Sequence, residues 1–432
     1  MLIFVSDIHL TDALHGGAVA RADTFERFWT RVQAARGARP AKLCFVGDLF
    51  DLVRSPSWLE TALRPYHDPS DALAAQVDAI VERILAREAA FFAAIRARVE
   101  EGALEVEYLL GNHDRLLAFA PRARRRVWKA LTGVDVDVEF EREASFPQHG
   151  VLAYHGHHSD PINISPQHQA TIGDAIGIEL ITRFPRMVKR LLPEDTPHAE
   201  LLDDIDDVRP IYAVPAWVRQ LGVIDRGLLR PTGETWRALV EDFLSKPFVK
   251  QWMRSRRAAE QKRLGFDTGQ KLKLLLELST KRVVARGSDQ RLTKLYSMLQ
   301  HGFDGKMAQH GIEALRARRG LRFVVNGHSH FASMLPLGNL DGRPAVYFNT
   351  GTWRTVHQIG NLAGGRPSFL PFDAMSYLVF FPSGDPLGRD FEWWTGAMVA
   401  AQGSTQRDPS QAHPAGQPSA HKGRSQLPDP QT

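Results

Sequence analysis

Five short polar segments, each directly after a short apolar run, constrain this chain more than any other feature of its sequence. They are Ser6–His9, Gly47–Asp51, Gly111–Asp114, His155–His158 and Gly327–His330. The apolar runs before them resemble buried strands, and helical patterns separate the first ones. An open α/β sheet places its ligand sites at the carboxyl ends of its strands. The sequence therefore predicts an α/β protein whose Asp, His and Asn side chains meet at one edge of a largely parallel sheet.

The order of expected elements suggests a split domain. Strands are expected over 2–5, 42–46, 106–110 and 151–154, helices over 23–36 and 71–100, and an edge strand over 134–140. Helical patterns then dominate, over 175–192, 234–244, 271–284 and 289–299. Strand patterns return after a helix at 312–319, over 321–325, 333–337, 345–348, 377–381 and 391–394. We therefore expect a catalytic domain made of residues 1–160 and 320–398, with a helical insertion over 161–319.

Composition limits the remaining possibilities. The chain has 432 residues, 43% of them hydrophobic, which is enough for a sizeable core. Its single cysteine, Cys44, excludes an intramolecular disulfide and a thiolate-cluster metal site. No apolar run approaches the length of a membrane span, and the N-terminus lacks a basic leader, so we expect a cytoplasmic protein. Residues 399–432 are rich in Pro, Gln and Ser, which predicts a disordered tail.

Charge is distributed unevenly over the expected insertion. The net charge of the chain is only +5, which does not favour a nucleic-acid partner but leaves one open. Residues 193–208 carry seven acidic and no basic side chains, whereas residues 246–294 carry 14 basic and 4 acidic ones. Pairing between the two blocks on solvated helices is one interpretation. A basic surface that attracts a polyanionic substrate is the other.

The five polar segments suit a pair of divalent cations. Imidazole nitrogens combined with carboxylate and amide oxygens are ligands for Mn, Fe or Zn. One carboxylate can bridge two ions, and such a pair stabilises the attacking and leaving oxygens of an in-line displacement at phosphorus. It also lowers the pKa of a bridging water, so that hydroxide is available near neutral pH.

In this order, the motifs D-x-H, G-D-x-x-D, G-N-H-D, H-G-H and G-H-x-H resemble those of the calcineurin-like metallophosphoesterase superfamily. The resemblance covers residues 1–160 and 320–395, but neither the insertion nor the tail. It implies a four-layer αββα sandwich and a dinuclear-metal hydrolase of phosphate mono- or diesters. It implies that Asp7, His9 and His330 hold the first metal, that Asp48 bridges both, and that Asn112, His155 and His328 hold the second. His113 would act on the phosphate as a general acid or a transition-state stabiliser, oriented by Asp51.

The motifs assign less specific roles to other residues near them. His155 is favoured as a ligand over His157, which could face the substrate, and over His158. Arg54 and Arg115 follow metal motifs and are candidates for binding the phosphate, because a guanidinium can donate two parallel hydrogen bonds to phosphate oxygens. Asp114 is expected to support the site, and residues 349–353 to buttress it as a turn.

The motifs do not assign the chain to one subfamily. Leu52-Val53 after Asp51, and Asp114 in place of Glu, argue against a protein serine/threonine phosphatase. His113 stands where lipid-precursor pyrophosphatases of the superfamily carry Arg, and only Gly47–Asp51 favours a nuclease. A non-catalytic interaction module of the same fold is the alternative from another class. Such modules typically lose ligands, whereas all of the expected ligands are present here.

The segment Ala175–Leu192 combines an apolar face with Arg183, Arg186 and Arg190 on the other. A basic amphipathic helix of this kind can rest on an anionic membrane surface. Packing against the catalytic domain as part of a cap is the favoured interpretation, and Pro185 predicts a kink or two shorter helices.

Overall fold

The computed structural model describes residues 1–13, 19–37, 40–164, 168–209, 211–260, 266–284, 305–361 and 367–398. Residues Met1–Met398 form one compact unit. The expected helix at 289–299 and the expected tail at 399–432 lie outside the described residues.

The first of two sheets contains the strands that carry the first three polar segments. Its order is β3-β2-β1-β11-β10-β6, with β12 paired to β11. The strands are β1 (Leu2–Val5), β2 (Ala41–Val46), β3 (Leu104–Leu109), β6 (Val208–Arg209), β10 (Trp353–Asn361), β11 (Pro367–Phe380) and β12 (Phe391–Met398). The strands β1 to β3 are parallel, so their carboxyl ends lie at the same edge.

The second sheet carries the other two polar segments. Its order is β4-β5-β7-β9-β8. The strands are β4 (Glu143–Phe146), β5 (Val151–Tyr154), β7 (Phe323–Asn326), β8 (Ser333–Leu340) and β9 (Arg343–Asn349). Because β5 and β7 are parallel neighbours, the segments after them also leave the sheet side by side.

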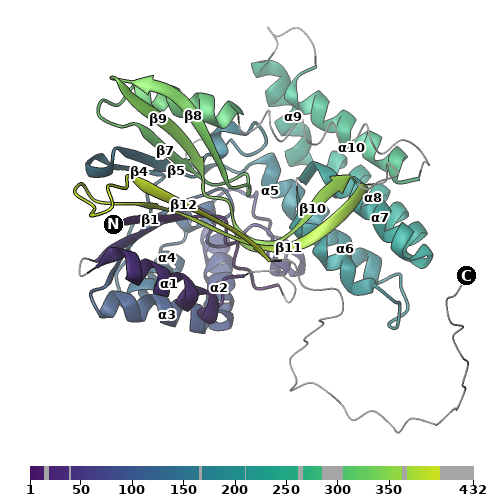
Figure 1. Ribbon diagram of the computed structural model, residues 1–432. Helices are drawn as coiled ribbons and strands as arrows, with labels where there is room; N and C mark the ends of the chain where they lie inside the picture. The colour runs from purple at the N-terminus through teal and green to yellow at the C-terminus, as the bar shows by residue number, and fades with distance from the viewer. Residues whose placement is uncertain are drawn as a thin grey trace, which may run out of the picture. The chain divides into compact units, whose positions relative to one another are not determined.

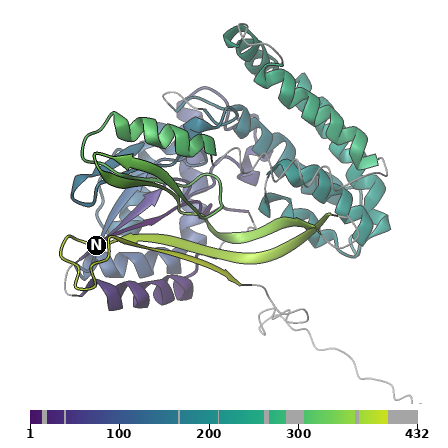
Figure 2. The same ribbon diagram turned by 45° about the horizontal axis from the view of Figure 1, so that its top comes forward.

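Apolar side chains on both faces of each sheet build four layers. Leu2 and Phe4 of β1 pack with Val151 of β5 between the sheets, whereas Ile3 and Val5 face the helices. The helices on that side are α1 (Ala22–Arg36), α2 (Asp71–Arg87), α3 (Ala89–Glu100) and α4 (Pro121–Thr132), seen at the lower left of Figure 1. A helix over residues 305–316 covers the outer face of the second sheet, beside β8 and β9 in Figure 2. The four-layer αββα prediction is confirmed.

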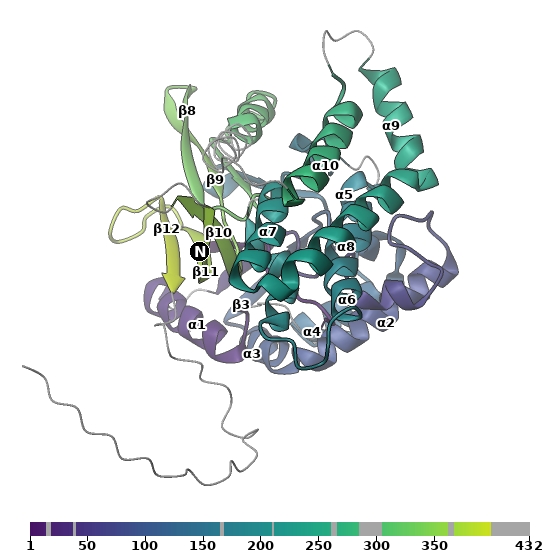
Figure 3. The same ribbon diagram turned by 90° about the vertical axis from the view of Figure 1, so that its right-hand side faces the viewer.

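Short helices join these layers to the helical insertion. Around the polar segments lie η1 (Pro56–Glu60), η2 (Arg115–Phe119), η3 (Pro147–His149) and η4 (His157–Ser159). The insertion contains α5 (Ile172–Ile176), η6 (Gly177–Thr182), α6 (Arg183–Lys189), η7 (Ala199–Asp207), η8 (Ile211–Ala213), α7 (Val214–Ile224), α8 (Arg226–Ser245), α9 (Pro247–Ala259) and α10 (Thr268–Val284). Figure 3 shows α7 to α10 side by side. One continuous apolar cluster joins the insertion to α1–α4.

The segment expected as a basic amphipathic helix is α5, η6 and α6 in succession, with η6 a turn of π-helix. Its apolar side chains Leu180, Phe184 and Val188 are buried, and Phe184 packs edge-on against Trp236 of α8. These side chains are packed inside the protein, as the cap interpretation expects, and they are not available to a membrane surface.

Two further expectations are corrected. The helix expected over 71–100 is two helices that meet at Glu88, where neither Gly nor Pro marks the break. Residues 134–140 form no strand, because Asp137 binds Arg124 and Asp135 binds Arg125 and Lys129, which holds the segment against α4. The edge strand beside β5 is β4 instead.

Candidate metal centre

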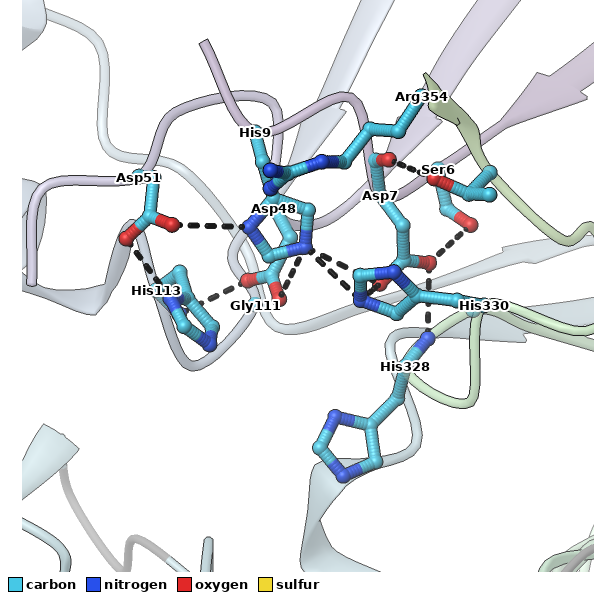
Figure 4. Close-up of polar contacts among 12 residues, drawn as sticks. Ser6, Asp7, His9, Asp48, Asp51, Gly111, His113, His328, His330 and Arg354 are labelled. Atoms are coloured by element: carbon cyan, nitrogen blue, oxygen red, sulfur yellow. Dashed lines mark hydrogen bonds and ion pairs between the residues drawn. The ribbon is translucent and has the colours of Figure 1, made fainter. Parts of the chain in front are cut away.

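The side chains expected as metal ligands lie where strands end and the backbone leaves the sheets. They follow β1 (Asp7, His9), β2 (Asp48), β3 (Asn112), β5 (His155) and β7 (His328, His330). Figure 4 shows Asp7, His9, Asp48 and His330 pointing toward one another from the loops after β1, β2 and β7. The order of the motifs in the sequence predicts this convergence.

Backbone strain is concentrated in these loops. Five of the seven residues have φ between 53° and 72°, namely Asp7, His9, Asp48, His328 and His330. A left-handed backbone costs a non-glycine residue roughly 1–2 kcal/mol. Hydrogen bonds between the loops stabilise this backbone conformation. The His9 N–H donates to the Asp48 carbonyl at 2.9 Å, and the Asp7 N–H donates to the Gly47 carbonyl at 3.2 Å. Strain of this kind is typical of functional sites.

Glycines let the loops approach each other. Gly47 has φ +81°, and a Cβ there would lie 2.6 Å from His155 Nδ1. A Cβ on Gly111 would meet the Asp48 carboxylate, and one on Gly327 the Asp7 carboxylate. Each of these glycines therefore gives a neighbouring carboxylate or imidazole the room that it occupies.

Three side chains form a first group. The Nε2 atoms of His9 and His330 lie 3.1 Å apart, and they lie 3.6 and 3.4 Å from Asp7 Oδ1. The other oxygen, Asp7 Oδ2, accepts hydrogen bonds from the Ser6 hydroxyl at 2.5 Å and the His328 N–H at 2.8 Å. Asp7 Oδ1 is buried and has no hydrogen-bond partner among the described residues. This oxygen and the two imidazoles therefore face one small space.

A second group forms around Asp48, His155 and His328, whose ligand atoms all lie within 4.8 Å of one another. His155 Nε2 lies 3.1 Å from Asp48 Oδ2 and 3.1 Å from Asn112 Oδ1. The same Asp48 oxygen lies 3.6 Å from His9 Nε2. Asp48 therefore stands between the two groups, as a bridging carboxylate would.

The second nitrogen of each imidazole decides which nitrogen faces the centre. His155 Nδ1 lies 2.8 Å from the Val46 carbonyl, His9 Nδ1 3.4 Å from Asp51 Oδ2, and His328 Nε2 3.2 Å from Asp160 Oδ2. An oxygen at this position fixes the tautomer that a metal requires. Two of these imidazoles also face a guanidinium, which can only donate: His9 Nδ1 lies 3.3 Å from Nη2 of Arg54, and His330 Nδ1 lies 3.1 Å from Nε of Arg209.

The electrostatics of the site favour positive charge at its centre. Burial raises the pKa of Asp48, but the imidazoles of His155, His113 and His9 outweigh it and hold this pKa well below its ordinary value. Burial lowers the pKa of His155, but Asp48 and Asp7 raise it overall to about 10. A dication in this position would replace the proton that these carboxylates attract. Together with the unpartnered Asp7 oxygen, this donor set fits divalent metals.

His113 lies beside Asp48 and beside the ring of His9, whose centre is 4.7 Å from its own. Its backbone N–H donates to Asp48 Oδ1 at 2.8 Å, and its Nδ1 lies 2.9 Å from Asp51 Oδ1. Its side chain is 20% exposed, whereas those of Asp48 and Asp51 are 1% exposed. Burial lowers the pKa of His113, but Asp51 raises it overall. An imidazole held in this way can give a proton to a group that approaches from solvent.

Asp114 holds the loops together. Its carboxylate accepts hydrogen bonds from the Gly111 N–H at 2.6 Å, the Tyr108 hydroxyl at 2.7 Å and the Leu49 N–H at 3.1 Å. Burial and the nearby Asp48 charge raise its pKa to about 7. Asp114 thus links the loop after β2 to the loop after β3 without facing the centre.

The three expected substrate-binding residues are buried. The Arg54 guanidinium binds Asp51 and Asp206, and the Arg115 guanidinium binds Asp174 at 2.8 Å. His157 is 3% exposed, and its ring centre lies 5.5 Å from that of His155. A role for these residues in binding substrate stays a prediction.

Several residues around the centre had no assigned role in the sequence. They are Asp160, Asp206, Arg209 and Arg354. Asp160 lies five residues after His155 and could have been found by looking for a partner to a ligand histidine. Nothing in the sequence marks the other three, because their places depend on how the insertion packs.

The turn at residues 349–353 supports the first loop. The Thr352 hydroxyl donates to the Asp7 carbonyl at 2.5 Å, and the hydroxyls of Thr350 and Ser6 lie 2.6 Å apart. The Asn349 amide donates to the Gly327 carbonyl at 2.5 Å. This turn therefore joins the loops after β1 and β7.

Comparison with known protein families gives a match over the first half of the chain. The family model for the calcineurin-like phosphoesterases matches residues 1–215, which include five of the seven expected ligands and the first part of the insertion. No curated protein matches the chain. None of the described helices is long and apolar enough to cross a membrane. By this match over residues 1–215, the chain is identified as a calcineurin-like phosphoesterase family member.

Proposed function

We propose that this protein is a hydrolase of phosphate mono- or diesters that works with two divalent metal ions. Asp7, His9 and His330 would hold the first ion, and Asn112, His155 and His328 the second, with Asp48 shared. Mn²⁺, Fe or Zn²⁺ fits these ligands. When bound, such a pair supplies the charge that stabilises both the attacking and the leaving oxygen at phosphorus.

The observation that carries the proposal is the position of Asp48. One of its oxygens lies within 3.6 Å of imidazoles from both groups, and the other is held by the His113 N–H. A carboxylate with one oxygen fixed and the other between two sets of ligands is suited to two cations rather than one.

The chain's own residues orient the substrate and supply the proton. Asp51 Oδ1 accepts a hydrogen bond from His113 Nδ1, which turns the other ring nitrogen away from Asp51. His113 would donate from that nitrogen, either to the leaving oxygen or to the phosphoryl group. Burial of Asp7, Asp48 and His155 excludes water from the side of the centre that faces the protein.

The first test compares metal-dependent turnover of bis(p-nitrophenyl) phosphate and p-nitrophenyl phosphate. Asp48→Asn should lower kcat/KM by about 10²-fold or more, because it weakens both metal positions. Asp78→Asn is the matched control, since Asp78 pairs with Arg126 on the helical face. Equal turnover by wild type and Asp48→Asn would contradict the proposal. Equal metal binding without turnover would favour an interaction module.

His113→Ala provides a second test on the same substrates. Loss of a general acid or a phosphate donor should lower kcat by about 10²–10⁴-fold, while bound metal stays at the wild-type level. Metal content by plasma mass spectrometry separates this loss from loss of the ions. An unchanged kcat would exclude His113 from the reaction.

A further inference from the structure

Among the described residues of the helical insertion, the end of η7 and strand β6 bring charged side chains next to the candidate centre. The strand β6 pairs with β10, so that Val208 and Arg209 lie opposite His357 and Gln358. This pairing fixes the two residues before it, Asp206 and Asp207, beside Arg354 at the start of β10. Asp206 and Asp207, in the most acidic part of the insertion, thus bind arginines of the catalytic layers.

Asp206 is shared by two arginines that come from the catalytic layers. One of its carboxylate oxygens binds Nη1 of Arg54, and the other accepts from Nη2 of Arg354 at 3.0 Å. The same Arg354 nitrogen donates to Asp207 Oδ1 at 2.6 Å. Arg54 is 8% exposed and Arg354 is 2% exposed. Two buried cations therefore depend on carboxylates from the insertion for their charge balance.

Arg54 in turn holds the carboxylate of Asp51 in place. Its Nε donates to Asp51 Oδ2 at 2.5 Å, and its backbone N–H donates to Asp51 Oδ1 at 3.1 Å. With Oδ2 taken by Arg54, Oδ1 is the oxygen that faces His113 Nδ1. The contacts form a chain from Asp206 through Arg54 and Asp51 to His113. Figure 4 shows its last part, with dashed lines from Asp51 to His113 and to His9.

We propose that Asp206 is a positioning residue for His113, acting through the Arg54 guanidinium and the Asp51 carboxylate. The helical insertion is then part of the catalytic machinery and not only a cover over it. Arg54, expected from the sequence to grip the phosphate, instead orients the residue that acts on it. The kinetic part of this inference rests on the proposed function, whereas its structural part does not.

The structural test needs no substrate. In ¹⁵N-histidine-labelled protein, the Nδ1 proton of His113 should give a downfield resonance that is absent from His113→Ala. Asp206→Asn should broaden or remove this resonance, because a loosened Asp51 no longer protects the proton from exchange. Asp203→Asn is the control: Asp203 lies on the same η7 but binds Lys189 of α6. An unchanged His113 resonance in Asp206→Asn would overturn the proposal.

The kinetic test is a double-mutant cycle. Asp206→Asn should lower kcat by about tenfold with little change in KM or bound metal, as expected for a misplaced proton donor. In a His113→Ala background, Asp206→Asn should lower kcat less than about twofold, because the residue that Asp206 positions is absent. Asp206→Glu, which keeps the charge, should restore part of kcat. An equal loss in both backgrounds would show that Asp206 does not act through His113.

Two controls keep these outcomes distinct. Thermal unfolding checks that Asp206→Asn is folded; if it is not, Arg54→Lys replaces it, because one ammonium group cannot bridge both carboxylates as the guanidinium does. If the wild type shows no phosphoesterase turnover, the proposed function fails, and the His113 resonance still decides whether Asp206 positions that ring.

Discussion

The backbone is strained at five of the seven expected ligand residues, and two of these, Asp48 and His328, directly follow a glycine. The side chains of Asp48 and His328 can turn into the centre only because the loops pass within contact distance of each other at Gly47, Gly111 and Gly327. The sequence showed these glycines and the ligand types. It could not show that the ligands themselves adopt positive φ, because that follows from contacts between loops far apart in the chain.

Replacement of Gly47 by Ala should therefore destabilise the protein more than backbone strain alone predicts. The added Cβ would lie 2.6 Å from His155 Nδ1, where the buried ring has no room to move. We expect a loss of about 2–4 kcal/mol in the free energy of unfolding. Gly102→Ala is the control, because Gly102 also has positive φ but no atom near its Cβ position. It should cost about 1 kcal/mol, and equal losses in urea unfolding would refute the argument.

Arg209 should weaken metal binding at the first group. Its cation is buried, and its Nε–H faces Nδ1 of His330, which favours the tautomer that keeps a proton on Nε2. Arg209→Gln removes the charge and offers an oxygen to Nδ1, so Mn²⁺ should bind about tenfold more tightly at one site. Isothermal titration calorimetry measures the two affinities. Unchanged or weaker binding by a folded variant would contradict this expectation.

At the scale of elements, the sequence was sufficient to predict a strand or helix whose own residues carry the whole pattern. The strands β1 and β5 have the expected bounds, because each is a short apolar run that ends at a polar motif. The two-residue β6 could not be found, because it exists only through its pairing with β10. The break at Glu88 and the segment 134–140 were missed for a similar reason: side-chain packing and ion pairs with α4 decide them.

The exposed basic side chains of α9 give an element-scale prediction. Lys250, Arg254 and Arg257 are exposed, and Arg256 stacks on Trp252 at 5.3 Å. If this helix attracts the substrate, replacing Arg254, Arg256 and Arg257 together by Gln should raise KM for a polyanionic substrate about threefold or more at low salt. The change should vanish at high salt, and kcat should not alter. An unaltered KM at low salt would exclude the basic surface from substrate capture.

At the scale of the whole molecule, one apolar cluster extends from the helices that cover the first sheet into the insertion. Phe184 and Trp236 of the insertion belong to the same cluster as Phe25 and Phe28 of α1. Sequence patterns predicted helices in this part of the chain but not this continuity. Amphipathic faces show that a helix is buried, whereas the partner that buries it is decided by the tertiary fold.

A single cooperative unfolding transition follows from this shared core. Phe184→Ala should destabilise the molecule by about 3–5 kcal/mol, because it leaves a cavity beside Trp236. Fluorescence and circular dichroism should report the same shifted midpoint in urea. Two separate transitions, with only one of them shifted, would show that the insertion unfolds independently.

The central claim is that two cations share Asp48 between groups of side chains that the fold brings together. Crystals grown with Mn²⁺ and measured at the manganese absorption edge test it most directly. We predict two anomalous peaks about 3.5–4 Å apart, one beside Asp7, His9 and His330 and one beside Asn112, His155 and His328. The absence of both peaks, or a single peak that does not contact Asp48, would contradict the account.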